Sequence, residues 1–274
     1  MTPWVAVLVA FFVWWFATGF ILMVVRHADL HGPWMCRAVT LGSLPLLIAG
    51  FWGYAFALTD TSIYGIYLAF FSALVVWGWV ELAFLTGIIA GPIQKPLPEG
   101  VGELERFLRA WGTVAFHEML LVGILIVLIF LGWGTDNMFG MWIFIVLYAA
   151  RLSAKLNLYF GVPKVNIEFL PTMLCHLPSH FRRRAMNWFF PISVSVLTFV
   201  IACWLQRLQA AASPADAIGF ALLTAITALA LFEHWMMVLP LPDERLWRWM
   251  LPTGPSTSKT YTSLPTRQED AHGL

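Results

Sequence analysis

Charged residues are scarce in this sequence. Only 11% of the 274 residues are Asp, Glu, Lys or Arg, and the net charge is +1. A soluble domain carries about 25% charged residues. The composition therefore excludes a globular protein that covers its whole surface with polar groups. The balanced net charge also excludes the strongly basic surface that nucleic-acid binding requires, so no nucleic-acid partner is predicted.

Cysteine is scarce as well. The three cysteines, Cys36, Cys175 and Cys203, are an odd number without paired spacing, which excludes a disulfide framework and a zinc ribbon. The N-terminal apolar run has no basic stretch before it and no small-residue cleavage site after it. A cleaved signal peptide is therefore not expected, and the first helix should remain in the mature protein.

Apolar residues make up 60% of the chain, and they occur in long runs. A helix needs about 20 consecutive apolar residues to cross a hydrocarbon core roughly 30 Å thick. The sequence therefore predicts an all-α, polytopic transmembrane helix bundle of about seven spans. The predicted spans lie near residues 3–25, 39–58, 64–91, 108–132, 138–158, 188–206 and 215–239.

The basic residues predict an orientation. With seven spans, fifteen of the sixteen Lys and Arg residues fall on one side of the membrane, and only Arg207 falls on the other. Loops rich in Lys and Arg stay in the cytoplasm. The expected topology is therefore N-terminus outside and C-terminus inside.

Two segments outside the spans have distinct compositions. Residues 1–252 are predicted to form one integral membrane domain, in which the 160–187 connection lies along the cytoplasmic interface. The triplet Arg182–Arg184 in that connection is a candidate site for anionic lipid. Residues 253–274 have the composition of a disordered cytoplasmic tail.

Ionisable residues inside the spans are the main functional signal. A charge at the bilayer centre costs about 2.5–3.5 kcal/mol even on the lenient insertion scale, so each one needs a reason. At about 1.5 Å per residue, most of them lie roughly 9–15 Å from the cytoplasmic ends of four different spans, and Lys155 lies about 5 Å in. The sequence predicts one buried polar layer, formed by Glu81, His117, Glu118, Arg151, Lys155, Glu233 and His234.

Helical spacing places Tyr148, Arg151, Lys155 and Tyr159 on one face of the fifth predicted span. That face carries two positive charges, which can meet the three carboxylates of the layer. Charges within a bundle pair with one another or face a water-filled cavity. One interpretation is thus a structural ion-pair network that fixes helix packing without adding stability.

The other interpretations are functional, and the sequence leaves them open. A metal centre is one, because carboxylate and imidazole ligands suit iron or manganese, although no span has a Glu-x-x-His pair. Its candidate ligands are Glu81, His117, Glu118, Glu233 and His234. Axial ligation of a chlorophyll-type or haem macrocycle is another, with His117 or His234 as the ligand. Proton or solute transport is a third, which no pair of broken helices supports.

Histidines outside the spans are expected to be solvated interfacial residues rather than ligands. They are His27, His31, His176 and His180. A weaker alternative is that Cys175, His176 and Glu168 fold back over the polar layer, since they lie on its side of the membrane.

Four blocks of sequence carry a family resemblance: YAARLSAKLNLYFGVP at 148–163, EFLP at 168–171, HLPSHFRRRAMNWFFP at 176–191 and FEHWMMVLPLP at 232–242. Through these blocks, residues 1–250 resemble the PuhE family of photosynthetic complex assembly proteins of purple phototrophic bacteria. The resemblance implies a multi-pass protein of the bacterial inner membrane that assists assembly of the reaction centre and light-harvesting antenna, or modulates their bacteriochlorophyll supply. It supplies no catalytic residue.

Three hypotheses follow. The first is an assembly factor that holds, delivers or modulates bacteriochlorophyll or a precursor through the buried polar layer. Its partners would be reaction-centre or light-harvesting polypeptides, or enzymes of bacteriochlorophyll synthesis. The second is a membrane metalloenzyme acting on a tetrapyrrole or isoprenoid precursor, with Arg151 or Lys155 meeting an acidic group of the substrate. The third is a passive scaffold. Whether the protein is an enzyme stays open at this point.

Overall fold

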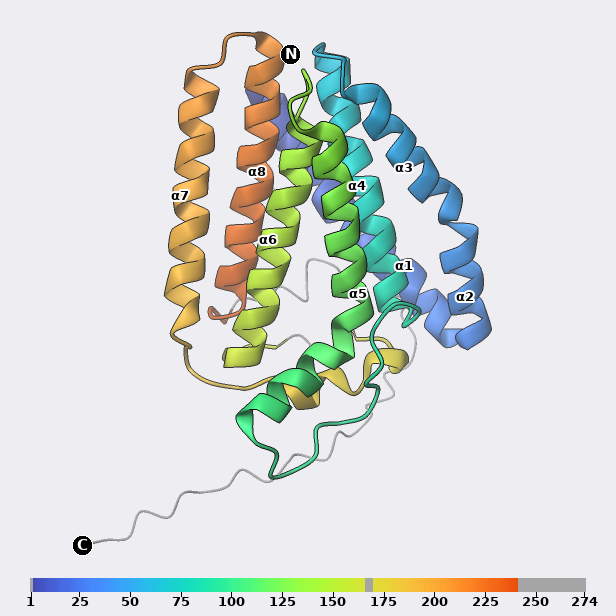
Figure 1. The fold of residues 1–274 in the computed structure, drawn as a ribbon. Coiled ribbons are helices and arrows are strands. Elements are labelled where there is room, and N and C mark those ends of the chain that lie inside the picture. The colour runs from blue at the N-terminus through green and yellow to red at the C-terminus, as the bar shows by residue number, and fades with distance from the viewer. Residues whose placement is uncertain (1, 166–169, 241–274) are drawn as a thin grey trace, which may run out of the picture.

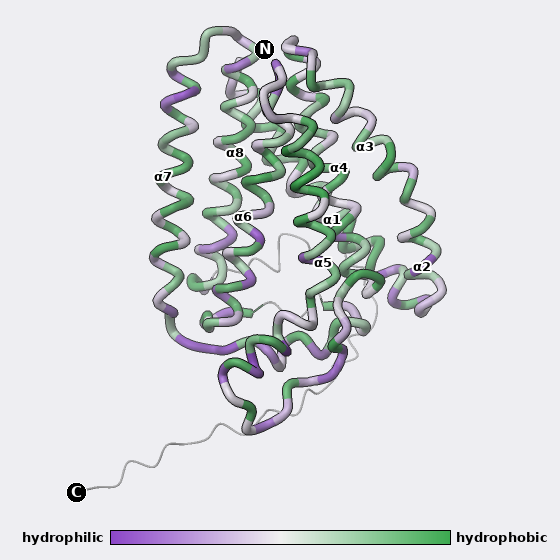
Figure 2. The backbone as a smooth tube through the Cα atoms, viewed as in Figure 1, coloured by the Kyte–Doolittle hydropathy of each residue, from purple (hydrophilic) through white to green (hydrophobic). Residues whose placement is uncertain are grey.

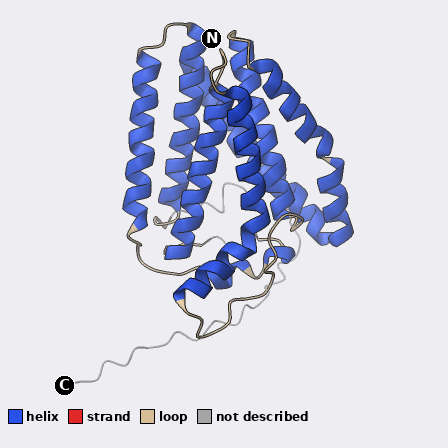
Figure 3. Cartoon of the chain, in the orientation of Figure 1, coloured by secondary structure: helices blue, strands red, loops and turns tan. Residues whose placement is uncertain are grey.

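A computed structural model describes residues 2–165 and 170–240, and the regular elements of these residues are all helical (Figures 1 and 3). Seven stretches are long and apolar enough to cross a membrane, with α2 and α3 together forming one of them. The all-α class and the seven predicted spans are therefore confirmed. The helices are α1 (Pro3–Leu30), α2 (Pro33–Gly42), α3 (Leu44–Ala57), α4 (Ile63–Leu85), α5 (Glu103–Gly132), α6 (Phe139–Phe160), α7 (Phe189–Gln209) and α8 (Pro214–Met236), with short 3-10 helices η1 (Thr172–Leu174) and η2 (Leu177–His180).

Helices α4, α6 and α8 lie at the centre of the bundle, whereas α7 packs on α8 and α3 packs on α4 at its periphery (Figure 1). Helix α1 starts at one end of the bundle, and the connection 86–102 and the described residues 161–165 and 170–188 lie at the other end (Figure 1). Hydrophilic residues gather in these connections (Figure 2), and Lys95, Lys164 and Arg182–Arg184 lie in them, so we call this end the basic end. That it faces the cytoplasm remains a prediction.

The second span is longer than predicted and is broken. It begins at Pro33 rather than residue 39, and the helix is interrupted at Ser43. Pro45 has no N–H and cannot continue the hydrogen-bond ladder of α2. The Ser43 hydroxyl instead donates to the Thr40 carbonyl at 2.9 Å, which satisfies one of the carbonyls that the break leaves open.

The third span ends earlier than predicted, at Leu85 rather than residue 91. Gly87 has a φ of +78°, and the N–H groups of Gly87 and Ile88 donate to the Phe84 and Ala83 carbonyls. This is the Schellman arrangement, in which a left-handed glycine closes a helix. Glu81 therefore lies one turn from the end of α4, which makes it shallower than the sequence indicated.

After this cap, the chain runs back along α5. The Ile93 N–H donates to Gly112 O at 3.2 Å, and the His117 N–H donates to Ala90 O at 3.3 Å. A Cβ at Gly91 would collide with the backbone of Gly112 and Thr113, so only glycine permits this approach. Non-helical backbone is tolerated within a membrane protein where other protein covers it. The segment fixes His117 beside the last turn of α4.

Two starts of helices have local causes. α5 begins at Glu103 instead of residue 108. Glu103 and Glu105 lie in its first turn, where negative side chains interact favourably with the positive end of the helix dipole and so stabilise this start. α8 begins after Ser213, whose hydroxyl accepts the Asp216 N–H at 3.0 Å as an N-cap.

The half of the bundle away from the basic end has an apolar core, formed by the first halves of α1, α4, α6 and α8. Phe70, Ile143 and Leu222 are fully buried there, together with several alanines. Large apolar side chains on the outer helices are exposed, as lipid contact requires. The core thus needs no charged residue to hold these helices together.

The described residues of the 161–188 connection, 161–165 and 170–188, fold back beneath the bundle. Arg182 donates its N–H to Leu158 O at 3.2 Å and pairs with Glu103, whereas Arg183 and Arg184 are exposed. Asn187 donates to Gly161 O at 2.8 Å and accepts the Phe189 N–H at 2.9 Å, which ties α6 to the start of α7. Glu168 and the predicted tail 253–274 lie outside the described residues.

Candidate functional site

Five of the seven residues of the predicted polar layer meet in one place. Glu81 comes from α4, His117 and Glu118 come from α5, and Arg151 and Lys155 come from α6. We call these five residues the charged network. It lies in the half of the bundle towards the basic end, where α4, α5 and α6 approach one another.

The contacts in the charged network form a chain of alternating charge. The Arg151 Nη2 donates to Glu81 Oε2 at 2.9 Å, and Lys155 pairs with Glu118. His117 lies between these two pairs, with Nε2 3.8 Å from Glu81 Oε1 and Nδ1 2.9 Å from Lys155 Nζ. Nδ1 also lies 3.4 Å from Glu118 Oε1. The ammonium contact is the shorter of the two and an ammonium group only donates, so we infer that Nδ1 accepts from Lys155 and that Nε2 carries the proton on the side of Glu81.

Glu233 extends the network to a fourth helix. It lies close enough to Arg151 for electrostatic attraction, and the Trp14 indole of α1 hydrogen-bonds to it. His234, its neighbour in sequence, belongs to a different contact. Its Nδ1 donates to Ala230 O at 2.8 Å, and its Nε2 accepts from the Ser153 hydroxyl at 2.9 Å. His234 therefore joins α8 to α6 without entering the network.

A cavity of about 500 Å³ adjoins the charged network, between α1, α4, α5, α6, α8 and the described residues 164–165 and 170–181 of the connection that follows α6. We call it the central cavity. Most of its lining is apolar or aromatic, and four network or neighbouring side chains border it. The lining includes Leu22, Phe84, Phe107, Trp111, Leu152, Tyr159, Leu177, His180 and Met236, with Glu118, Arg151, Lys155, Lys164 and Glu233 as its charged members among the described residues.

The side chains of the charged network differ in how far they are exposed. The Arg151 side chain is 39% exposed although it lies deep in the bundle, whereas Glu81 and Glu118 are 12% exposed and His117 is fully buried. Glu233 is exposed as well. Among the charged groups that the helices contribute to the lining, Arg151 and Glu233 are therefore the most available to a bound molecule. An apolar cavity with a few charged groups on one side is suited to an amphiphilic ligand.

The five candidate metal ligands are not brought together. No group of three or more His, Cys, Asp or Glu residues suited to a metal ion occurs in the part of the chain that the structure describes. Glu81, His117 and Glu118 are neighbours, but the ammonium of Lys155 lies between His117 and Glu118. Glu233 and His234 point to different partners. The contacts therefore favour ion pairing over a metal centre at these residues.

The two predicted axial ligands lie away from the central cavity. His117 and His234 are almost completely buried, and neither lines the central cavity. The prediction that histidines outside the spans are solvated is confirmed for His27 and His31, which are exposed, and wrong for His176 and His180. These two are 3% and 2% exposed, because the 161–188 connection folds under the bundle instead of lying open at the interface.

His180 lines the central cavity and is the functional candidate that the sequence analysis missed. Burial lowers the pKa of both His176 and His180, so both favour the neutral form. The spacing of four residues between them was the available signal, but it could not show that the segment is buried. Cys175, beside them, is exposed.

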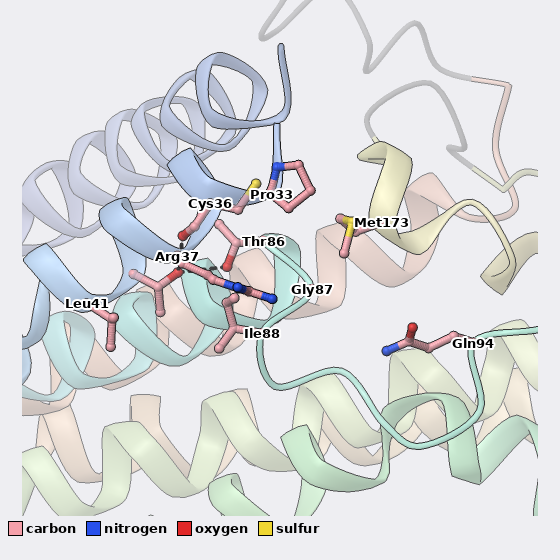
Figure 4. Close-up of a pocket in the computed structure, with 10 residues that line it drawn as sticks. Pro33, Cys36, Arg37, Leu41, Thr86, Gly87, Ile88, Gln94 and Met173 are labelled. Atoms are coloured by element: carbon pink, nitrogen blue, oxygen red, sulfur yellow. Dashed lines mark hydrogen bonds between the residues drawn. The ribbon is translucent and has the colours of Figure 1, made fainter. Parts of the chain in front are cut away.

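A second cavity, of about 470 Å³, lies between α2 and the segment that follows α4. Figure 4 shows Arg37 reaching from α2 towards Gly87 and Ile88, with Met173 on the far side. Thr40 and Thr86 are hydrogen-bonded at 2.8 Å in its wall. Arg37 is the single charged group in its lining, so this cavity lacks the paired charges of the central cavity.

Comparisons with known proteins place the chain in a family. Over 258 residues, the chain is 50% identical to the "Uncharacterized 30.4 kDa protein in puhA 5'region" of Rhodobacter capsulatus, with 94% of each chain covered. No solved structure matches. A family model described as "Protein of unknown function (DUF3623)" matches residues 1–258. The chain therefore belongs to the DUF3623 family.

Proposed function

We propose that this protein is an assembly factor for the bacterial photosynthetic reaction centre and its light-harvesting complexes, which holds or delivers bacteriochlorophyll or a precursor in the central cavity. The printed name of the Rhodobacter capsulatus relative places it in the puhA 5' region, which together with the resemblance to the PuhE family supports a photosynthetic role. The sequence blocks that resemble the PuhE family support the assembly role.

The observation that carries the proposal is the central cavity. Its volume of about 500 Å³ lies within the roughly 300–1,000 Å³ typical of ligand sites. Its aromatic and aliphatic lining suits the faces of a pigment macrocycle, and Arg151 and Glu233 offer a donor and an acceptor for polar groups at its rim. The residues present therefore fit such a group.

In this function, the chain's own residues bind and orient the pigment. The apolar lining excludes water, and the charged network fixes the helices that surround the cavity. We further propose that the basic end faces the cytoplasm, and that exposed Arg183 and Arg184 contact anionic lipid there. A pigment held at this depth is within reach of reaction-centre or antenna polypeptides in the same membrane.

The test is the absorption spectrum of the protein purified gently from a phototrophic host, together with the levels of assembled complexes in a deletion strain. We expect bound pigment at a stoichiometry near one, and reduced or unbalanced complexes in the deletion strain. Normal complexes and normal pigment content without the gene would contradict the proposal. Accumulation of one defined pathway intermediate would instead indicate an enzyme.

A passive scaffold is the second candidate. The burial of His117 within the charged network and the two hydrogen bonds of His234 favour it. Replacement of His117 by Gln distinguishes the scaffold from the pigment-holding assembly factor. A scaffold tolerates the change and complements the deletion fully, provided that the variant accumulates in the membrane. Loss of complementation by a variant that accumulates normally would exclude the scaffold.

A further inference from the structure

His180 has one ring nitrogen in use. Its Nδ1 lies 3.3 Å from His176 O and 3.2 Å from the Ser179 hydroxyl. A carbonyl oxygen can only accept a hydrogen bond, so Nδ1 carries the proton of the neutral ring. The backbone of η2 thus fixes both the tautomer and the position of this imidazole.

The other nitrogen, Nε2, is buried and has no hydrogen-bond partner in the structure. In the neutral ring it presents an unprotonated lone pair. Burial lowers the pKa of His180, and nearby Arg109 lowers it further, which keeps that lone pair free near neutral pH. Histidines that bind metals donate their other N–H in this way, to a backbone carbonyl or a carboxylate.

Among the histidines that the structure describes, no other buried one combines these properties. Nε2 of His117 is also without a hydrogen-bond partner, but it lies 3.8 Å from Glu81 Oε1 and His117 does not line the central cavity. Both nitrogens of His234 have partners. Nε2 of His176 is also without a partner, but His176 does not line the central cavity. His180 is therefore the imidazole that a molecule in the cavity would meet.

The surroundings of His180 limit what it can bind. A bound zinc ion takes three or four protein ligands, and no group of three suitable side chains occurs among residues 2–165 and 170–240. A lone imidazole beside an apolar cavity instead suits a metal that arrives with its other ligands. A metallated tetrapyrrole supplies four ring nitrogens and leaves an axial position for one protein ligand.

We propose that Nε2 of His180 is the axial ligand of a metallated tetrapyrrole held in the central cavity. This inference rests on the proposed function and adds the coordinating residue and the metallated state of the ligand. It also replaces His117 and His234, the two axial candidates of the sequence analysis. Phe107 and Tyr159, which line the same cavity, supply aromatic contacts for the ring.

The experiment compares two probes on the purified full chain in detergent: zinc protoporphyrin and metal-free protoporphyrin. Both should bind the unaltered protein, and the zinc form should show the red-shifted absorption of a five-coordinate metal. His180→Ala should remove that shift and weaken binding of the zinc form at least about tenfold, because loss of even a supporting group costs about 10–100-fold in metal affinity. Binding of the metal-free form should be unchanged.

His176→Ala is the matched control, since it removes a buried histidine from the same segment and should leave the shift intact. Added imidazole should restore the shift to His180→Ala. If removal of His180 destabilises the protein, His180→Gln keeps a polar side chain of similar size and gives the same comparison. Full retention of the shift without His180 would overturn the inference.

The two proposals fail in different ways. If metal-free protoporphyrin binds and zinc protoporphyrin shows no five-coordinate spectrum, the axial ligand is wrong and the pigment-holding function stands. If neither probe binds the unaltered protein, the central cavity does not hold tetrapyrroles, and both proposals are overturned.

Discussion

The two halves of the bundle hold the same helices together by different means. Away from the basic end, α4, α6 and α8 meet through Phe70, Ile143 and Leu222, all fully buried. Towards the basic end, α4 and α6 meet through the ion pair of Glu81 with Arg151. The apolar half shows that packing is sufficient to join these helices, as is usual in membranes.

The difference indicates why the charged half exists. Replacing a buried ion pair by apolar residues of similar volume is often neutral or stabilising. Ionisable residues within membrane spans are instead retained mostly where they serve a pathway, a relay or a ligand. Since the central cavity adjoins the charged half and not the apolar half, we attribute the charges to function.

The largest loss of unfolding free energy should come from breaking one ion pair in the charged half. Arg151→Leu leaves Glu81 buried without its cationic partner, and we expect a loss of about 3–5 kcal/mol in unfolding free energy. Thermal unfolding of the purified protein in detergent measures the change.

The matched control is the double change Glu81→Gln with Arg151→Gln, which removes both charges together. It should recover most of the loss, because no unpaired charge remains. If the double variant is as unstable as Arg151→Leu, the charged half contributes stability like the apolar half, and the contrast between them disappears.

A smaller loss should follow truncation in the apolar half. Phe70→Ala should cost about 2–3 kcal/mol, from the cavity it leaves, because exposure to lipid rather than water removes part of the usual penalty. The same unfolding measurement applies, and pigment binding should be unchanged. Loss of binding in a stably folded Phe70→Ala protein would show that the two halves are coupled.

The smallest loss of unfolding free energy should come from removing the hydrogen bond between two neutral side chains in the wall of the second cavity. Thr86→Val removes the 2.8 Å hydrogen bond to Thr40 with little change in shape, and we expect a loss of about 1 kcal/mol. Complementation of the deletion strain should remain complete. A strong defect with normal accumulation would indicate that this cavity, and not the central one, carries the function.

Arg151, Lys155 and Glu81 show which contacts could be predicted from the sequence. The spacing of Arg151 and Lys155 correctly indicated that both line one side of α6, and both border the central cavity. Glu81 met Arg151 as expected, since pairing is the way to accommodate two charges in a low-dielectric interior. The predicted depth of Glu81 from the end of its span was less accurate, because the glycine cap at Gly87 ends α4 early and turns the chain back along α5.

His234 and His180 show where the sequence could not decide. His234 stands beside Glu233, yet successive helical residues point about 100° apart, and its ring turns to Ser153. His180 lies in a connection of little regular structure, and its burial depends on how that connection folds under α5 and α6. No local pattern encodes such a contact.

Composition and apolar run length by themselves determined the membrane setting, the seven spans and the helical class, because backbone groups in lipid must be satisfied within each segment. Only the tertiary structure decided which charges pair, where the cavity lies and which imidazole with an unpartnered nitrogen lines it. Those properties arise between helices and a folded-back connection, and they are set by contacts among residues far apart in the chain.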